Sequence, residues 1–177
     1  MRAFKLIPFP TLQIPAIEIM GTITKQDNLL SIHFSVQGDI DDILLPVQID
    51  FPTRKHDLWK ATCFEFFIAL KNQPGYWEFN LSPSSDWNVY AMDAYRQVNM
   101  REEAAFQSLP FEFCKTSEEI SLDISVDLEP ILRSDQILQI GITTIIETLD
   151  GSETYWALAH PGSQADFHVR EGFVIEL

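Results

Sequence analysis

The sequence contains few cysteines and no long hydrophobic run. Cys63 and Cys114 are the two cysteines among 177 residues, and one pair cannot build the disulfide framework of a small secreted domain. Both lie in strand-like segments, so we expect packed thiols rather than a bridge. No uninterrupted apolar stretch approaches the ~20 residues that a membrane span requires.

Basic residues are also scarce. The chain has 12 Lys and Arg against 26 Asp and Glu, which gives a formal net charge of −14. Phosphate binding needs a surplus of Lys and Arg on some face, so we expect no nucleic-acid partner. An anionic membrane surface is disfavoured for the same reason. The acidic residues are spread along the chain, which is typical of a solvated surface.

The N-terminal segment differs from a secretory signal. Arg2 and Lys5 resemble its basic start, but Pro8, Pro10 and Pro15 would break the apolar helix that has to follow. Together with the low cysteine count, this favours a soluble protein in the cytoplasm.

Motifs of common catalytic and metal sites are missing. The chain has no nucleophile elbow, no phosphate-binding loop and no zinc-spaced histidine cluster. His160 and His168 lie eight residues apart with Asp166 between them, which matches no recognised zinc pattern. The run Asp39-Ile40-Asp41-Asp42 lacks the spacing of a calcium loop, so we predict a solvated turn. We therefore assign no catalytic residue and no metal site.

A regular alternation of apolar and polar residues is present instead. Apolar residues make up 46% of the chain and charged residues 21%, which is a globular composition. The alternation has period two nearly everywhere, and the helix-like stretches are short. This predicts one all-β domain over residues 1–177, an antiparallel β-sandwich of jelly-roll or immunoglobulin-like type with about ten short strands and little helix. The predicted strands are 17–24, 30–37, 62–70, 76–82, 88–96, 111–116, 120–127, 137–148, 153–159 and 173–177, and the helix-like stretches are 100–108 and 128–132.

Two hairpins follow from the same pattern. Asp150-Gly151 is a strong two-residue turn signal between the strands 137–148 and 153–159. Around the loop 71–75, placing Glu65 opposite Asn80 brings apolar side chains together on one side of the sheet. We therefore predict a core that contains Phe64, Phe66, Trp77, Phe79, Leu122, Ile124, Ile140 and Ile142.

The other side of this hairpin is polar. It displays Glu65, Glu78 and Asn80, and Glu65 lies between Cys63 and Phe67, so we expect it to be half-buried. A half-buried carboxylate needs partners; Asn80 is one candidate, and Arg96 from the next predicted strand would supply a charge. Two interpretations remain open: a structural polar network, or a set of groups that binds a small polar ligand.

The tryptophans allow a similar choice. Trp77 falls on the core side, whereas Trp59, Trp87 and Trp156 are each suited either to core packing or to ligand stacking. An exposed indole beside carboxylate and amide groups is the arrangement that binds sugars, because the indole face takes the apolar face of a pyranose while the polar groups bind its hydroxyls.

The arrangement of these residues along the chain resembles a known family. Trp59 lies six residues before Glu65, Tyr-x-Glu-Phe-Asn-x-Ser-Pro starts at Tyr76, and Tyr-Trp-Ala-Leu at 155–158 precedes His-Pro at 160–161 and Asp-Phe-His at 166–168. This resembles small bacterial DOMON-like proteins, which are related to family 9 carbohydrate-binding modules.

The resemblance implies an antiparallel β-sandwich. It also implies sugar-binding relatives that clamp a terminal sugar between two tryptophans, with charged and amide side chains on its hydroxyls. Trp59 and Glu65 match one such tryptophan and its following carboxylate, and Trp156 is nearest to the second by chain order.

We therefore predict a non-catalytic module that binds a carbohydrate or a similar small polar ligand. The predicted ligand-binding residues are Trp59, Glu65, Glu78, Asn80, Trp87, Arg96, Trp156, His160, Asp166 and His168.

Two alternatives remain. Other DOMON domains bind haem through Met and His, for which Met20, Met92, Met100, His33, His160 and His168 are candidates, although we expect no cofactor. Glu65 and Glu78 would suit a glycosidase if their carboxyl groups lie about 5–9 Å apart.

Overall fold

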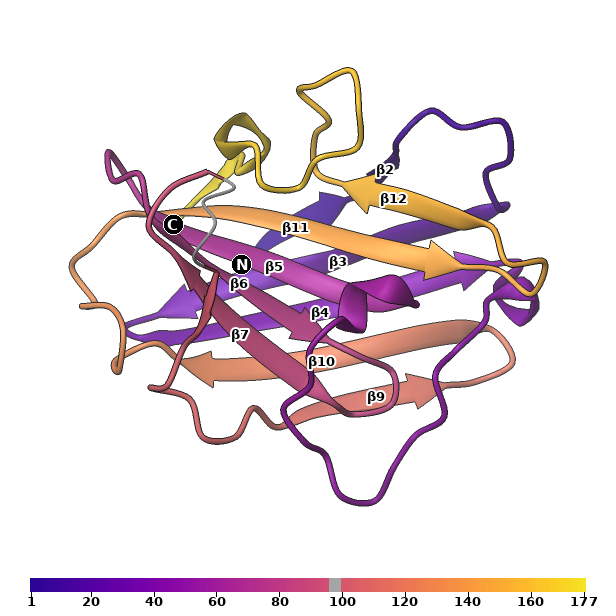
Figure 1. Ribbon diagram of the computed structural model, residues 1–177, viewed down its shortest axis with the longest axis horizontal. Coiled ribbons are helices and arrows are strands. Elements are labelled where there is room, and N and C mark those ends of the chain that lie inside the picture. Colours follow the sequence, from indigo (N-terminus) through magenta and orange to yellow (C-terminus); the bar gives the residue numbers. More distant parts are fainter. Residues whose placement is uncertain (96–99) are drawn as a thin grey trace.

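Two antiparallel sheets stack on one another in the computed structural model, which describes residues 1–95 and 100–177 (Figure 1). The smaller sheet has the order β1-β3-β4-β10-β9, and the larger has the order β2-β12-β11-β5-β6-β7-β8, with β13 also paired to β11. The strands of the smaller sheet are β1 (Arg2–Lys5), β3 (Ile17–Gln26), β4 (Leu29–Gly38), β9 (Phe111–Lys115) and β10 (Glu119–Asp127). The strands of the larger sheet are β2 (Ile7–Pro8), β5 (Cys63–Leu70), β6 (Tyr76–Leu81), β7 (Trp87–Met92), β8 (Arg101–Glu102), β11 (Leu138–Glu147), β12 (Glu153–Ala157) and β13 (Ile175–Glu176).

Helix is limited to three short 3₁₀ turns in the described ranges: η1 (Ile40–Asp42), η2 (Leu58–Lys60) and η3 (Arg170–Gly172). The all-β sandwich predicted from the period-two pattern is therefore confirmed. These turns have three residues each, so none of the helical segments in the described ranges could span a membrane.

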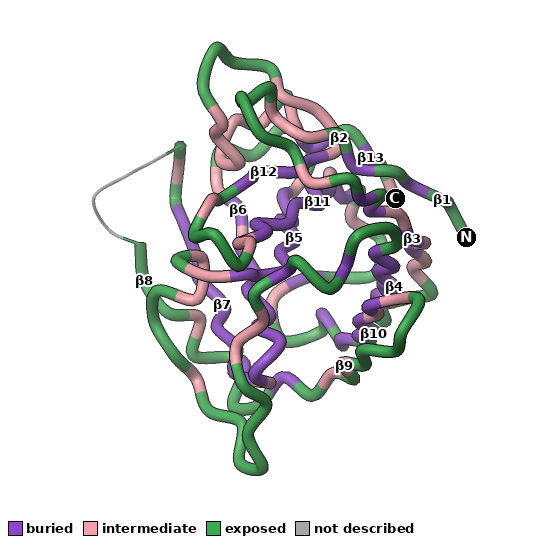
Figure 2. The backbone as a smooth tube through the Cα atoms, turned by 90° about the vertical axis from the view of Figure 1, so that its right-hand side faces the viewer, coloured by how far each residue is buried: buried purple, intermediate pink, exposed green. Residues whose placement is uncertain are grey.

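The hydrophobic core lies between the two sheets, which Figure 2 shows side by side. Phe66 and Phe79, which are paired across β5 and β6, stack there with ring centroids 4.4 Å apart. Seven of the eight predicted core residues are buried in this cluster, and the exception is Trp77. Trp77 packs against the cluster but is only partly buried, and its indole Nε1 donates a hydrogen bond to Glu103 Oε2.

The hairpin of β5 and β6 has the predicted register, with Glu65 opposite Asn80 and Phe66 opposite Phe79. The hairpin of β11 and β12 differs from the prediction. Thr148 N–H donates to the Ser152 carbonyl, so the loop has three residues rather than two. Gly151 supplies the positive φ of 83° that such a loop needs at its last position.

Other expectations need correction. Residues 100–108 contain β8 and turns instead of a helix, and 128–132 form one tight turn. Cys63 is a buried thiol as expected, but Cys114 is exposed on the edge strand β9. The strands β1, β2 and β8 were not predicted, since two to four residues are too few to establish a period.

The two sheets differ in burial, and this difference positions the site. On β10, buried and more exposed residues alternate, as on a sheet with one wet face. On β5 and β7, nearly every residue is buried, so the outer face of the larger sheet must also be covered. Among the described residues, η2 and the segment 158–174 contribute to this cover; the segment follows β12, and we call it the covering segment. Phe173 of the covering segment packs there with Phe67, Ala69, Tyr76, Tyr90 and Met92 in a second apolar cluster.

Candidate functional site

A pocket of about 250 Å³ opens beside this second cluster, on the outer face of the larger sheet. Its floor comes from β5, β6 and β11, and its walls come from η2, β12 and the covering segment. Two carboxyl groups therefore meet aromatic rings in one small cavity. The described lining residues are Trp59, Glu65, Phe67, Glu78, Met100, Ile145, Tyr155, Ala165, Phe167 and His168.

Glu65 and Glu78 form the floor, and both are buried, with exposures of 2% and 4%. Because Glu65 is opposite Asn80 in the register, Glu78 is its diagonal neighbour on the same face. Thr143 donates a hydrogen bond to Glu65 Oε2 at 3.1 Å, and Asn80 donates one to Glu78 Oε1 at 2.9 Å. The other two oxygens, Glu65 Oε1 and Glu78 Oε2, have no hydrogen-bond partner among the described residues.

Burial raises the pKa of both carboxyl groups. For Glu78, burial outweighs the hydrogen bond from Asn80 and raises the pKa from 4.5 to about 7. For Glu65, burial and the neighbouring Glu78 charge raise the pKa well above its usual range, against the hydrogen bond from Thr143. The pair therefore retains at least part of a shared proton near neutral pH. Burial and the Glu65 charge also raise the pKa of the Cys63 thiol, so it stays protonated.

The pocket walls are mostly aromatic. Trp59 lies on η2, is partly exposed, and packs edge-on against Tyr90 with ring centroids 5.8 Å apart. Phe167 of the covering segment contacts Tyr155 of β12 in the same edge-on way, at 6.1 Å. Phe67 of β5 completes the aromatic part of the lining. Flat apolar rings around buried acids suit a small ligand that has both an apolar face and polar groups.

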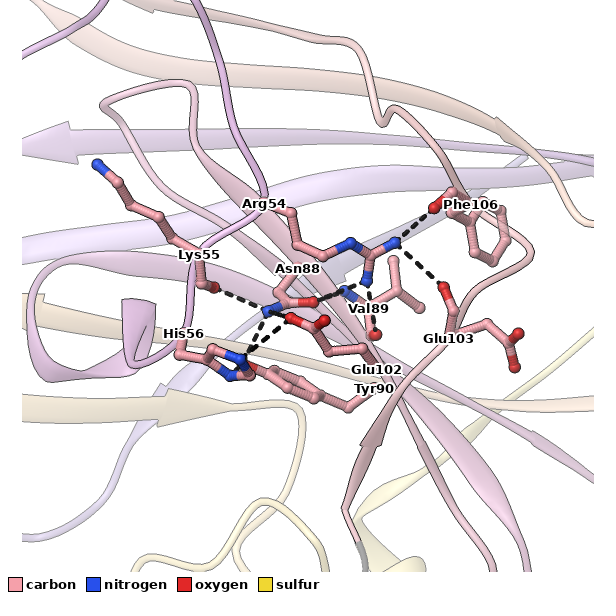
Figure 3. A network of polar contacts seen from close by, with 9 residues as sticks. All are labelled: Arg54, Lys55, His56, Asn88, Val89, Tyr90, Glu102, Glu103 and Phe106. Atoms are coloured by element: carbon pink, nitrogen blue, oxygen red, sulfur yellow. Dashed lines mark hydrogen bonds and ion pairs between the residues drawn. The ribbon is translucent and has the colours of Figure 1, made fainter.

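A polar network positions the chain that leads into η2 (Figure 3). Arg54 donates to the Asn88 side chain at 3.0 Å and to the carbonyls of Val89, Glu103 and Phe106. Its guanidinium also lies 4.4 Å from the centroid of a Trp87 ring. Because Arg54 is five residues before Trp59, these bonds attach the start of the η2 segment to β7.

Side-chain contacts also attach the covering segment to the sheet. Arg170 donates to the Gln73 carbonyl at 2.8 Å and to Gln139 Oε1 at 2.7 Å. His168 Nδ1 lies 3.0 Å from the Tyr76 hydroxyl. Phe173 packs over Gly141 of β11, where a Cβ atom would come within 2.8 Å of the phenyl ring. The bare glycine therefore lets the segment approach the sheet closely.

Four predicted site residues line the pocket: Trp59, Glu65, Glu78 and His168. Asn80 is buried beneath it as the hydrogen-bond partner of Glu78, while Thr143 takes the role expected of Asn80 towards Glu65. Glu65 is fully buried rather than half-buried.

The remaining predicted residues are placed elsewhere. Trp87 and Trp156, with exposures of 4% and 3%, pack in the main core, which corrects the expectation that they face a ligand. His160 Nε2 lies within hydrogen-bond distance of the Ile7 carbonyl, at 2.9 Å, and Asp166 accepts a hydrogen bond from the Tyr95 hydroxyl at 2.6 Å. Neither is among the described lining residues. Arg96 lies outside the described residues.

Two of the six haem candidates lie in the pocket, and the others lie elsewhere. Met100 and His168 line the pocket, Met92 lies in the second cluster, and His33 pairs with Asp123 on the smaller sheet. The pocket of about 250 Å³ is below the usual ~300–1,000 Å³ of pockets for drug-sized ligands. The haem alternative stays a prediction. Within the described ranges, no group of three or more His, Cys, Asp or Glu residues could bind a metal ion.

Sequence reasoning missed several residues of the site. Phe67 and Tyr155 share a sheet face with Glu65, so strand alternation contained that signal. Phe167 and Arg54 lie in irregular segments, where no period indicates a direction.

Comparisons with known proteins identify the fold. No family model and no curated protein matches the sequence. Among solved structures, a protein from Bacteroides uniformis that is named as a candidate carbohydrate-binding protein superposes with a TM-score of 0.68. It is 11% identical, and the match covers 97% of this chain and 83% of the other.

A family 9 carbohydrate-binding module from Caldicellulosiruptor kristjanssonii, solved in complex with glucose, superposes with a TM-score of 0.50. It is 9% identical, and the match covers 82% of this chain and 69% of the other. The chain thus shares its β-sandwich fold with these two structures, whereas the DOMON assignment stays a prediction.

Proposed function

We propose that the protein is a non-catalytic binding module whose pocket takes a carbohydrate of monosaccharide size. The observation that carries this proposal is that Glu65 and Glu78 line an aromatic pocket, while the buried oxygens Glu65 Oε1 and Glu78 Oε2 have no partner among the described residues. A buried acceptor without a partner costs free energy that a ligand hydroxyl can recover by donating a hydrogen bond.

The walls support the same ligand class. Trp59 and Phe167 present apolar rings, which suit the C–H face of a pyranose, while the floor suits its hydroxyl groups. The volume of about 250 Å³ suits one sugar residue better than a longer chain. Two solved proteins of this fold are named for carbohydrate binding, which is consistent with the proposal.

Affinity should be weak. A hexose has about a dozen non-hydrogen atoms, and at about 0.3 kcal/mol per atom it binds with about 4 kcal/mol, or a Kd of about 1 mM. Calorimetry and tryptophan fluorescence with glucose, galactose, xylose and cellobiose test this.

Trp59→Ala should weaken binding of the best sugar about five- to thirtyfold, since stacking contributes on the order of 1–2 kcal/mol. Trp77→Phe is the matched control, because Trp77 is also partly exposed but faces the core between the sheets. The proposal is wrong if no sugar of the panel binds at tens of millimolar, or if Trp59→Ala binds as the unchanged protein does.

Hydrolysis is the second candidate, because both carboxyl groups of the predicted glycosidase pair lie in one pocket. A glycosidase needs one protonated and one ionised carboxyl, which a pair with a shared proton can provide. Nitrophenyl glycosides test it: release that disappears in Glu65→Gln establishes catalysis, and no release above the buffer rate rejects it for those glycosides.

A further inference from the structure

The charge of the pocket floor narrows the ligand class. Glu65 and Glu78 lie on neighbouring strands of one buried face, and the described pocket lining contains no Lys or Arg to neutralise them. The nearby Lys60 of η2 is exposed and bonds to Asp57 at 2.6 Å. Two buried carboxyl groups therefore face the cavity without a described cation.

The orphaned oxygens distinguish an amine from a hydroxyl group. A hydroxyl has one hydrogen to donate and no charge. An ammonium group has three, so one ammonium can satisfy Glu65 Oε1 and Glu78 Oε2 together, and its positive charge offsets the pair. The rings of Trp59 and Phe167 also attract a cation through their faces.

We propose that the pocket selects a sugar with a protonated primary amine, which lies against the orphaned oxygens of Glu65 and Glu78. This rests on the proposed function, because it names the kind of sugar that the same pocket prefers. The amine lies on the acidic floor and the pyranose ring lies between the aromatic walls.

A proton should leave on binding. The pair retains part of a shared proton near neutral pH, and an ammonium group favours ionisation of both carboxyl groups, whereas a neutral sugar does not. Calorimetry in two buffers of different ionisation enthalpy measures this release. Other titratable groups around the pair are Cys63 of β5, Tyr76 of β6, Tyr90 of β7, Tyr155 of β12 and His168 of the covering segment.

The test compares glucosamine, N-acetylglucosamine, glucose and ethanolamine by calorimetry at pH 6.5 in 150 mM salt. Glucosamine should bind about tenfold or more tightly than the two neutral sugars, because a charge-assisted hydrogen bond is stronger than a neutral one. It should also release a proton, and ethanolamine should bind more weakly than glucosamine because it has no ring to stack.

Two variants distinguish the effect of the pocket carboxyl groups from that of the net negative charge of the protein. Glu78→Gln should reduce the preference for glucosamine over glucose to about threefold or less, because the amide keeps the shape but not the charge. Glu118→Gln removes the same charge from an exposed turn of the smaller sheet and should leave the preference unchanged. Backbone amide NMR spectra establish that each variant is folded.

The outcomes distinguish the two proposals. Equal binding of glucosamine and glucose overturns the amine preference and leaves the sugar-binding function standing. Ethanolamine binding as tightly as glucosamine overturns the sugar assignment. Binding by none of the four compounds overturns the amine preference, and galactose, xylose and cellobiose then decide whether the sugar-binding function stands. An unchanged preference in Glu78→Gln overturns the role of the acidic floor.

Discussion

Glu78→Gln should make the folding stability of the protein less sensitive to rising pH. Glu78 is 4% exposed, and burial raises its pKa from 4.5 to about 7. Because the folded state binds this proton more tightly than the unfolded chain does, the stabilisation is fully present below pH 4.5 and is lost as pH rises through about 7. At 1.36 kcal/mol for each pKa unit, the difference of about 2.5 amounts to about 3 kcal/mol.

Urea unfolding at pH 5 and pH 8, followed by tryptophan fluorescence, measures this loss. The free energy of unfolding of Glu78→Gln, relative to the unchanged protein, should rise by about 2.5 kcal/mol between the two pH values, because part of the effect is already lost at pH 5. Using the difference between proteins cancels the general effect of the net charge of −14. Removal of the Glu78 charge also lowers the pKa of Glu65, which adds to the expected change in the same direction.

The control is Glu118→Gln, whose exposed carboxyl should show no such pH dependence. A free-energy difference between Glu78→Gln and the unchanged protein that is the same at pH 5 and pH 8 would refute the reasoning. The buried carboxyl would then be stabilised in its ionised form, and the acidic floor would be a satisfied structural network.

Three further predictions concern stability. Trp156→Ala should lower the free energy of unfolding by about 3–5 kcal/mol, because it empties part of the main core. Trp59→Ala should lower it by less, because Trp59 is partly exposed. Equal losses of free energy in urea unfolding would contradict this placement. Gly141→Ala should lower the free energy of unfolding by about 1–3 kcal/mol, and therefore the Tm, because the added Cβ atom pushes Phe173 from the sheet. An unchanged Tm would show that the covering segment can shift without loss of stability. Arg54→Lys should lower the Tm as well, because an ammonium group cannot reproduce the fork that bonds four acceptors, and a Tm equal to that of the unchanged protein would contradict the network's role.

Which side chains share a face of a strand could be predicted, because this depends only on neighbouring residues. Alternation along 62–70 and 76–82 sets which side chains share a face, and the apolar side must meet the core. This reasoning correctly placed Glu65, Glu78 and Asn80 on one face and predicted their register. It also placed Trp59 near that face, although this relied on family resemblance as well.

The assignment of the other tryptophans failed for a physical reason. Alternation shows that neighbouring residues point to opposite sides, but a strand buried on both faces gives no contrast between them. Trp87 lies on such a strand, and the core side was not distinguishable from the covered side. Trp156 was misplaced by the resemblance, which matched chain order rather than strand direction.

The amino-acid sequence by itself determined the strands, the pairing of β5 with β6 and the presence of two acidic side chains on one sheet face, because each follows from alternation and pairing between residues close along the chain. The all-β class follows from the same alternation, although its two sheets are joined by pairings between distant strands. Only the tertiary structure decided that those acids form a pocket. The covering segment lies about a hundred residues after Glu65 and folds back across the outer face, bringing Phe167 and His168 over β5 and β6. No short-range pattern encodes that return, since it depends on Phe173, Gly141 and Arg170 meeting across the sheet.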